Sequence, residues 1–344
     1  MPDTIVENLH NLADKMLGKE KTGVSAPYDD MQAVLDAQAK LGAQPIETLT
    51  PDVARKQPTP ADGVAVVLRE KGKDPTDPMG VETSDIEYDG AAGKLAARVY
   101  KPEGADASEH LPVVLYFHGG GFVIANIDVY DASPRAIAKM AKAIVVSAEY
   151  RQAPEHKFPG AHDDAFAAYQ WLLANVESLG GDPTRIAIMG ESAGGGLALA
   201  TSVKARDLGL QAPVRQVLVY PVAGVDMETE SYRLYANAKP LNKAMMAWFV
   251  GHYLNDDGDK ADPRIDAIGL ADLSNLPDTT IVNAEIDPLC SDGELLAAKL
   301  ERAGVNVNRR VFDGATHEFF GMGAVVGEAK HAEDMVASDL KSSF

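Results

Sequence analysis

The sequence predicts an α/β fold, with a mostly parallel central sheet that helices cover on both faces. Short apolar runs rich in Val and Ile alternate along the chain with helical patterns such as AHDDAFAAYQWLLANV and DGELLAAKLERAG. The runs are VVLYF, AIVVSAEY, RIAIMG, RQVLVYP, TTIVNAE and VNRRVFDG. Several of them are apolar on both faces, which is typical of strands buried in a parallel sheet. Before them, DIEYDGAAGKLAARVYKP predicts two strands around a glycine-containing turn.

Composition and charge narrow the function classes. The 344 residues allow one large domain or two ordinary ones, and the 46% apolar content is that of a globular chain. With 32 basic and 51 acidic residues the net charge is -19, and such a surface repels nucleic-acid phosphates. No apolar run approaches the about 20 residues that cross a membrane, and the first residues lack a signal-peptide pattern. We therefore expect a cytoplasmic protein with no nucleic-acid or membrane partner.

The region before the sheet, residues 1–80, is helical in pattern. Asp29 or Asp30 is expected to cap a helix over MQAVLDAQAKL, and a second helix is expected through VAVVLRE. The apolar residues of the first helix recur on one face: Met31, Val34, Leu35 and Leu41. Such a segment is expected to be a lid or brace that contributes to a cap, rather than a separate binding module.

One insertion, residues 223–265, interrupts the α/β domain that we assign to residues 81–222 and 266–344. It contains ETESYRLYANAKPLNKAMMAWFVGHYLNDD, which is helical in pattern. Its Met245, Met246, Trp248 and Phe249 could be ordinary helix packing. The position of the insertion between two expected strands favours a cap over the strand ends.

A serine stands where a strand is expected to turn sharply into a helix. The strand RIAIM is followed by Gly190-Glu191-Ser192-Ala193-Gly194 and the helical pattern GGLALATSVKAR. Flanking glycines let the backbone pass close to itself, and a helix N-terminus favours the negative charge that develops there. A phosphate-binding loop is the rival interpretation, but its Lys-Ser/Thr ending is missing. Ser192 is therefore the candidate nucleophile.

Three consecutive glycines follow the strand VVLYF, in His118-Gly119-Gly120-Gly121-Phe122. Their backbone N–H groups are free to face a small anion, as an oxyanion hole requires. The alternative is a flexible turn, but a turn needs neither the histidine nor a place upstream of a nucleophile. We expect this loop to stabilise an oxyanion.

A serine nucleophile needs a base, and the base needs an orienting carboxylate. His317 is the best base because it follows the late strand VNRRVFDG at the carboxyl end of the sheet. The other histidines lie in polar stretches, in helical patterns, in the glycine loop or in the insertion: His10, His110, His118, His156, His162, His252 and His331.

Asp287 is the candidate carboxylate, because it comes directly after the strand TTIVNAE and is held by Pro288. Glu285, still inside the strand, and Asp292, expected to cap the helix GELLAAKL, are the alternatives. Cys290 has no Cys/His/Asn context and is interpreted as a packing residue. Since it is the single cysteine, it forms no intramolecular disulfide.

The sequence resembles the bacterial hormone-sensitive-lipase-like family of α/β-hydrolase esterases. The resemblance runs from about Met31 onward, through YFHGGGF, AEYRQAPEHKFPGAHDD, GESAGGG, DPLCSDG and THEF. The chain order Ser192, Asp287, His317 is also that of α/β-hydrolases. The resemblance implies that these residues are nucleophile, carboxylate and general base. It further implies an oxyanion hole built from the N–H groups of Gly119, Gly120 and Ala193.

Departures from the family pattern are few. Glu191 stands where Asp or Thr is common, Gln152 where Leu is, Cys290-Ser291-Asp292 where Arg-Asp-Glu is, and Glu318 where Gly is. Glu318 is expected to shift the pKa of the base or to pair with a cap residue. The family counterpart of residues 150–155 braces the active-site loops, and an Arg–carboxylate pair there is expected to position the glycine loop.

These patterns predict a serine carboxylesterase that works through an acyl-enzyme and needs no cofactor and no metal. Family resemblance implies short- to medium-chain esters, and dimers are frequent among members. Candidate substrate contacts are Phe122, Met245, Phe249 and Leu289. The alternatives are a lipase acting on longer acyl chains, a catalytically inactive small-molecule-binding protein of the same fold, an amidase and a lyase. The presence of both His317 and Asp287 favours the enzyme.

Overall fold

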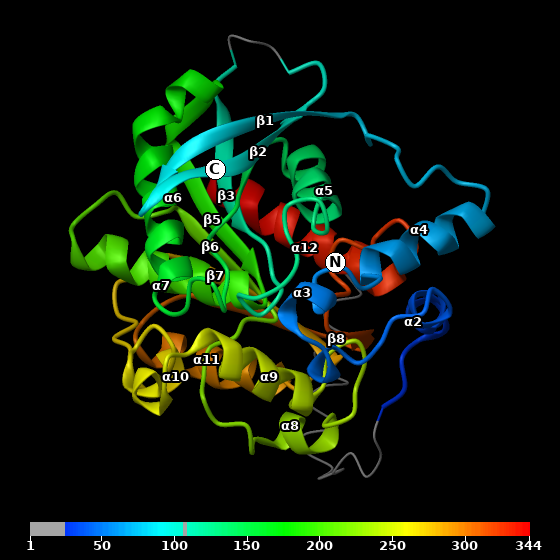
Figure 1. Cartoon of the computed structure of the whole chain (residues 1–344). Helices are drawn as coiled ribbons and strands as arrows, with labels where there is room; N and C mark the ends of the chain where they lie inside the picture. Colours follow the sequence, from blue (N-terminus) through cyan, green and yellow to red (C-terminus); the bar gives the residue numbers. More distant parts are fainter. Residues whose placement is uncertain (1–24, 106–108) are drawn as a thin grey trace, which may run out of the picture.

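The computed structural model describes residues 25–105 and 109–344, so the first part of the N-terminal region lies outside the described residues (Figure 1). Its centre is an eight-stranded sheet with the order β1-β2-β4-β3-β5-β6-β7-β8. The strands are β1 (Val81–Gly90), β2 (Gly93–Pro102), β3 (Leu111–Phe117), β4 (Ile144–Ala148), β5 (Gly181–Glu191), β6 (Arg215–Val219), β7 (Asp278–Ile286) and β8 (Val307–Thr316). The pairs β1–β2 and β2–β4 are antiparallel and the others parallel, which confirms the predicted sheet.

Helices cover both faces of the sheet, because its central strands are apolar on both sides. In β3, Val113 and Leu115 pack with the helices of one face, whereas Val114 and Tyr116 pack with those of the other. The first layer is α6 (Gly160–Asn175), α7 (Ala193–Asp207) and α11 (Cys290–Arg302). The second layer is α5 (Ala132–Ala141) and α12 (Gly327–Ser343).

The N-terminal segment forms α2 (Asp29–Lys40), the 3-10 turn η1 (Ile46–Thr48), α3 (Pro51–Ala54) and α4 (Pro60–Glu70). Both expected helices are present, but two details were wrong. Tyr28 precedes the first turn of α2, so Asp29 and Asp30 lie inside that turn, where their charge suits the helix dipole. Because α2 ends at Lys40, Leu41 falls outside it and is 46% exposed.

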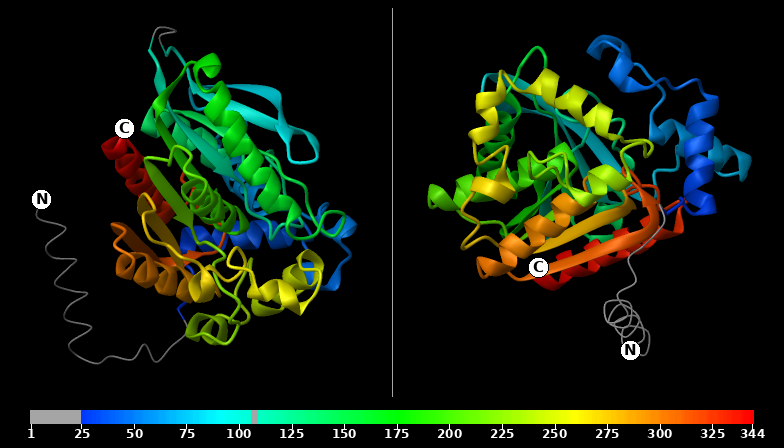
Figure 2. Two further views of the ribbon diagram at one scale, coloured as in Figure 1. Left: turned by 90° about the vertical axis from the view of Figure 1, so that its left-hand side faces the viewer. Right: turned by 90° about the horizontal axis from the view of Figure 1, so that it is seen from below.

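The insertion forms three short helical elements, α8 (Glu230–Leu234), α9 (Lys243–Tyr253) and η3 (Asp257–Ala261), and α10 (Ala267–Leu270) follows it. Pro240 cannot donate a helical hydrogen bond, and Asn242 starts α9 anew by accepting from the N–H of Met245 at 2.8 Å. The indole N–H of Trp248 donates to the carbonyl of Leu49 at 3.1 Å. The insertion therefore packs on the N-terminal segment, and both lie at the same end of the sheet (Figures 1 and 2).

Two features are absent from the part of the chain that the structure describes. No helix there is both apolar and long enough to span a bilayer. No cluster of three or more His, Cys, Asp or Glu side chains there is arranged to hold a metal ion.

Candidate active site

Ser192 occupies the turn between β5 and α7, in a backbone conformation that residues other than glycine rarely adopt (φ 55, ψ -116). The turn is tight enough to require glycine on both sides. A Cβ on Gly190 would lie 2.0 Å from the carbonyl oxygen of Gly194, and one on Gly194 would lie 2.1 Å from that of Phe117. The strained turn holds the serine hydroxyl at the end of the sheet.

Strand register places the other two side chains of the predicted triad. In the β7–β8 ladder Ile286 pairs with Thr316, so the residues that follow them, Asp287 and His317, emerge side by side. Nδ1 of His317 lies 2.6 Å from Oδ2 of Asp287, and Nε2 lies 3.0 Å from Oγ of Ser192. The structure thus brings the three residues into one hydrogen-bonded chain, and all three side chains are buried.

The protonation of His317 depends on opposing effects. Burial of the ring disfavours the charged form. The charge and hydrogen bond of Asp287, together with the charges of Glu318 and Glu191, outweigh burial and raise the pKa of His317 above 6.5. The second carboxylate oxygen of Asp287 accepts from the N–H of Leu289 at 2.9 Å, which fixes the orientation of the carboxylate.

The rival carboxylates are engaged elsewhere. Glu285 accepts from the hydroxyl of Ser25 at 2.6 Å and from the N–H of Gly314 at 2.8 Å. Asp292 does not cap the helix, because α11 already begins at Cys290. Its buried carboxylate accepts instead from the backbone N–H groups at 223 and 224, and burial raises its pKa to about 7.

The glycine loop lies beside the nucleophile, because Phe117 of β3 pairs with Gly190 of β5. Among the described residues, no acceptor is hydrogen-bonded to the backbone N–H groups of Gly119, Gly120 or Ala193. These are the N–H groups assigned to the oxyanion hole by resemblance. They are free to bind an external acceptor.

Residues 149–153 brace this loop from behind. The hydroxyl of Tyr150 donates to the carbonyl of His118 at 2.9 Å, and the amide of Gln152 donates to that of Ala125 at 2.9 Å. Residues 150–155 take part in two Arg–carboxylate pairs, Arg55 with Glu155 and Arg151 with Asp164. The guanidinium of Arg151 donates to Asp164 of α6 at 2.6 Å, whereas that of Arg55 donates to the carbonyl of Val123, next to the glycine loop, at 2.8 Å.

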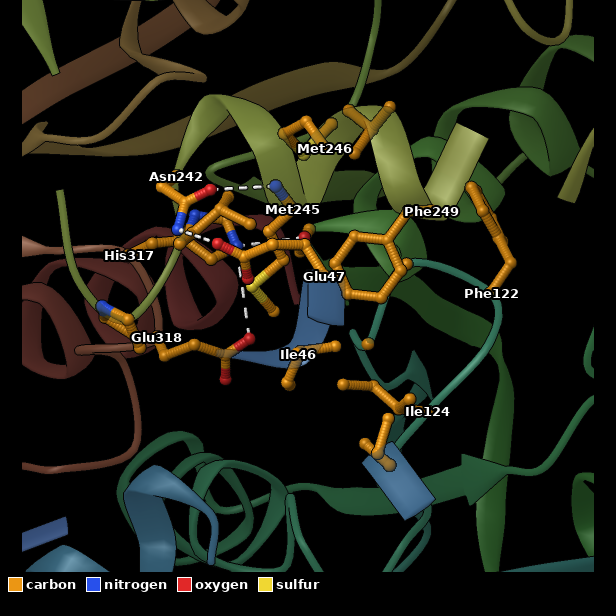
Figure 3. A pocket seen from close by; sticks show the side chains of 18 of the residues that line it. Ile46, Glu47, Phe122, Ile124, Asn242, Met245, Met246, Phe249, His317 and Glu318 are labelled. Carbon is orange, nitrogen blue, oxygen red and sulfur yellow. Dashed lines mark hydrogen bonds and ion pairs between the residues drawn. The ribbon is translucent and has the colours of Figure 1, made fainter. Parts of the chain in front are cut away.

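A cavity of about 590 Å³ opens onto Ser192 and His317 (Figure 3). The N-terminal segment and the insertion supply much of its wall. Three of the four predicted substrate contacts line it: Phe122, Met245 and Phe249. The fourth, Leu289, is not among the lining residues: its side chain is fully buried, and its N–H donates to the Asp287 carboxylate.

Sequence reasoning missed several side chains of the cavity. Ile46 and Glu47 reach it from η1, and Asn242 donates to Oε1 of Glu47 at 3.1 Å. The sequence carries no local pattern that predicts these contacts, because η1 and α9, which pack on each other, lie about 200 positions apart in the chain. Of the two expectations for Glu318, its charge does help to raise the pKa of His317, but its Oε1 accepts at 2.5 Å from the hydroxyl of Tyr130, which is not a residue of the expected cap.

Comparisons with known proteins agree with this geometry. A family profile described as the alpha/beta hydrolase fold matches residues 114–321. The chain is 38% identical over 295 residues to the carboxylesterase NlhH of Mycobacterium tuberculosis, covering 83% of this chain and 91% of that protein. It is 36% identical to an ethyl acetate hydrolase of Pseudomonas putida, covering 72% of this chain and 78% of that one.

Solved structures give the same result. The esterase of Pyrobaculum calidifontis superposes with a TM-score of 0.77 at 35% identity, covering 89% of this chain and 96% of that one. An α/β hydrolase enzyme from the Lake Arreo metagenome gives a TM-score of 0.81 at 32% identity, with 92% and 98% covered. With its sheet order, its glycine loop and its serine turn, the chain belongs to the hormone-sensitive-lipase-like family of α/β-hydrolase esterases.

Proposed function

We propose that the protein is a serine carboxylesterase that hydrolyses short- to medium-chain esters through an acyl-enzyme on Ser192. The observation that carries this proposal is the hydrogen-bonded chain at the foot of the cavity, with 3.0 Å from Oγ to Nε2 and 2.6 Å from Nδ1 to Asp287. This is the arrangement that activates a hydroxyl nucleophile. The names of the relatives, a carboxylesterase and an ethyl acetate hydrolase, support it.

In the first half of the reaction, His317 accepts the Ser192 proton at Nε2 while Oγ attacks the ester carbonyl. Asp287 stabilises the imidazolium that forms. When the tetrahedral intermediate collapses, Nε2 returns the proton to the leaving alkoxide, and the acyl group remains on Oγ. In the second half, His317 deprotonates a water that attacks the acyl-enzyme, which releases the acid and restores the serine.

The negative oxygen of each tetrahedral intermediate would be bound by the N–H groups of Gly119, Gly120 and Ala193. These donors are fixed before substrate arrives, because the bonds from Tyr150 and Gln152 hold the loop. Preorganised donors of this kind need no rearrangement as charge develops.

The preference for shorter acyl chains follows from crowding above the nucleophile. The ring of Phe249 lies so close to the glycine loop that a Cβ on Gly121 would sit 2.2 Å from it. The ring of Phe122 stacks on Tyr253 with 4.1 Å between centroids. We propose that residues 223–265 and the N-terminal segment form a cap that restricts the space around the acyl chain.

Initial rates on p-nitrophenyl acetate, butyrate, octanoate and palmitate test this proposal, with the Ser192→Ala variant measured alongside. We expect the highest kcat/KM at acetate or butyrate and no turnover above background in Ser192→Ala. A maximum at palmitate would keep the mechanism but make the protein a lipase. Equal rates in wild type and variant on all four esters would reject the carboxylesterase.

A further inference from the structure

A second carboxylate faces the reacting atoms. Oε1 of Glu318 lies 4.0 Å from Nε2 of His317, the nitrogen that also bonds Ser192. The hydroxyl of Tyr130 holds that oxygen, and the Glu318 side chain lines the cavity (Figure 3). None of the proton transfers derived above passes through this group.

We propose that Glu318 is a specificity-determining residue that selects esters whose alcohol part carries a positive charge. This inference rests on the proposed function, because it concerns which esters the same site accepts. It assigns Glu318 no part in bond making or breaking.

The distance between Glu318 and His317 places the carboxylate of Glu318 near the alcohol part of the bound ester. Nε2 must deliver its proton to the leaving oxygen, which then lies within about 3 Å of it. Since Oε1 is 4.0 Å from Nε2, the leaving oxygen lies within about 7 Å of the carboxylate. A cation two carbons beyond that oxygen can therefore approach Glu318 closely enough for its charge to affect binding in a site shielded from bulk water.

The backbone at this position is unfavourable for glutamate. Glu318 has φ 69, in the left-handed region that glycine adopts without strain. Glycine is also what the family resemblance places there. Strain that persists beside reacting atoms points to a function for the strained side chain.

Most basic residues that line the cavity are paired with carboxylates, so their charges do little to oppose a cationic substrate. Glu47 adds a second carboxylate. Of the basic residues that the structure describes in the lining, three pair with carboxylates at 2.7 to 2.8 Å: Arg55 with Glu155, Lys260 with Asp257 and Arg264 with Asp262. Lys239 is the fourth basic residue of the lining.

Ionisation of Glu318 gives the preference a pH dependence. Burial raises the pKa of Glu318 above 4.5, against the lowering effects of His317 and the Tyr130 hydroxyl. The titratable groups around it are Tyr116, His118, Tyr130, Tyr150, Glu191, Tyr220, Asp287 and His317. The preference for a cationic alcohol therefore increases as pH rises through the pKa of Glu318.

Two esters of equal shape isolate the charge: 2-(trimethylammonio)ethyl acetate and its uncharged analogue 3,3-dimethylbutyl acetate. The measured quantity is the ratio of their kcat/KM values at pH 8.5 in wild type, Glu318→Gln and Glu47→Gln. Glutamine keeps the shape and can still accept from Tyr130. Any effect on His317 acts on both esters, so it cancels in the ratio.

We expect the cationic-to-neutral ratio to fall about tenfold in Glu318→Gln, which corresponds to about 1.4 kcal/mol, and to fall less in Glu47→Gln. Equal ratios in wild type and Glu318→Gln would overturn the inference. An equal or larger fall in Glu47→Gln would also overturn it, because the selection would then come from the general charge of the cavity.

A measurement on wild type alone covers the case in which Glu318→Gln does not fold. Choline and 3,3-dimethylbutanol are compared as inhibitors of p-nitrophenyl acetate hydrolysis. Tighter inhibition by choline supports the inference, and equal inhibition contradicts it. If wild type hydrolyses p-nitrophenyl acetate no faster than Ser192→Ala, the proposed function itself has failed. If that ester is hydrolysed and only the charge preference is missing, the inference alone has failed.

Discussion

His317 is surrounded by acidic groups on several sides. Asp287 holds Nδ1 at 2.6 Å, Glu318 lies 4.0 Å from Nε2, and the charge of Glu191 acts on the ring as well. A buried imidazole alone would resist protonation, so the raised pKa results from these negative charges. The same charges stabilise the imidazolium that the reaction needs.

The pH dependence of activity follows from this environment. Only neutral His317 can act as a base, so kcat/KM should fall as the pH drops through its pKa, which is raised above 6.5. Glu318→Gln removes one of the charges that raise this pKa, and the acid limb should then move to lower pH. Rates between pH 4 and 9 measure the shift. A flat profile, or a limb that moves upward, would contradict this assignment.

The choice of Asp287 over Asp292 can be tested with a matched pair of substitutions. Asp287→Asn should lower kcat on the order of 10⁴-fold, because an amide no longer stabilises the imidazolium or the required tautomer. Asp292→Asn makes the same chemical change at a carboxylate that accepts hydrogen bonds from the backbone N–H groups at 223 and 224. It should leave kcat within about threefold of wild type, since the site lies elsewhere. A large loss in Asp292→Asn with a small one in Asp287→Asn would reverse the assignment.

At the scale of elements, the glycine loop is held in one conformation by its neighbours. Gly120 has φ 102, and a Cβ there would lie 2.1 Å from the carbonyl oxygen of Ile124. That carbonyl accepts from the side chain of Gln152 at 3.0 Å, so it cannot move freely. The contacts of the residues around the loop therefore hold it in this one conformation.

Gly120→Ala should lower kcat by about 10² or more, because the added methyl group displaces an oxyanion donor. Gly251→Ala, in α9, is the control: a Cβ there meets nothing within 4 Å. Alanine in a helix should raise the free energy of unfolding by about 0.5 to 1 kcal/mol and leave kcat unchanged. Rates and thermal unfolding of both variants test the pair. Full activity in Gly120→Ala would exclude this loop as the oxyanion site.

At the scale of the whole molecule, Arg55 fastens the N-terminal segment to the sheet domain. Its guanidinium donates to the carbonyls of Val123 and Ala153 and forms an ion pair with Glu155, each at 2.8 Å. One side chain thus joins the segment over the cavity to the chain that follows the glycine loop. Loosening it should affect both stability and substrate binding.

Arg55→Ala should lower the free energy of unfolding by about 1 to 3 kcal/mol and raise KM, because two backbone carbonyls lose their partner. Glu155→Ala removes only the half-exposed carboxylate and should cost less than about 1 kcal/mol. Urea unfolding and KM for p-nitrophenyl butyrate compare the two variants. Equal losses in both would show that the ion pair, rather than the carbonyl contacts, fastens the segment.

How much the sequence predicts depends on the range of the interaction. Ser192, Asp287 and His317 each follow a strand, and parallel strands bring such positions together. The local sequence pattern was therefore enough to predict that the three residues cluster. The cavity wall was harder to predict. Glu47 reaches it only through tertiary docking, and Leu289 is fully buried although it lies two residues after Asp287.

The central claim is that Ser192 is the nucleophile, and covalent trapping tests it most directly. The protein is treated with a p-nitrophenyl alkylphosphonate, digested and analysed by mass spectrometry. We expect a single adduct on the peptide that contains Ser192, loss of ester hydrolysis in proportion to labelling, and much slower labelling in His317→Ala. An adduct on another residue, or hydrolysis that survives complete labelling, would contradict the account.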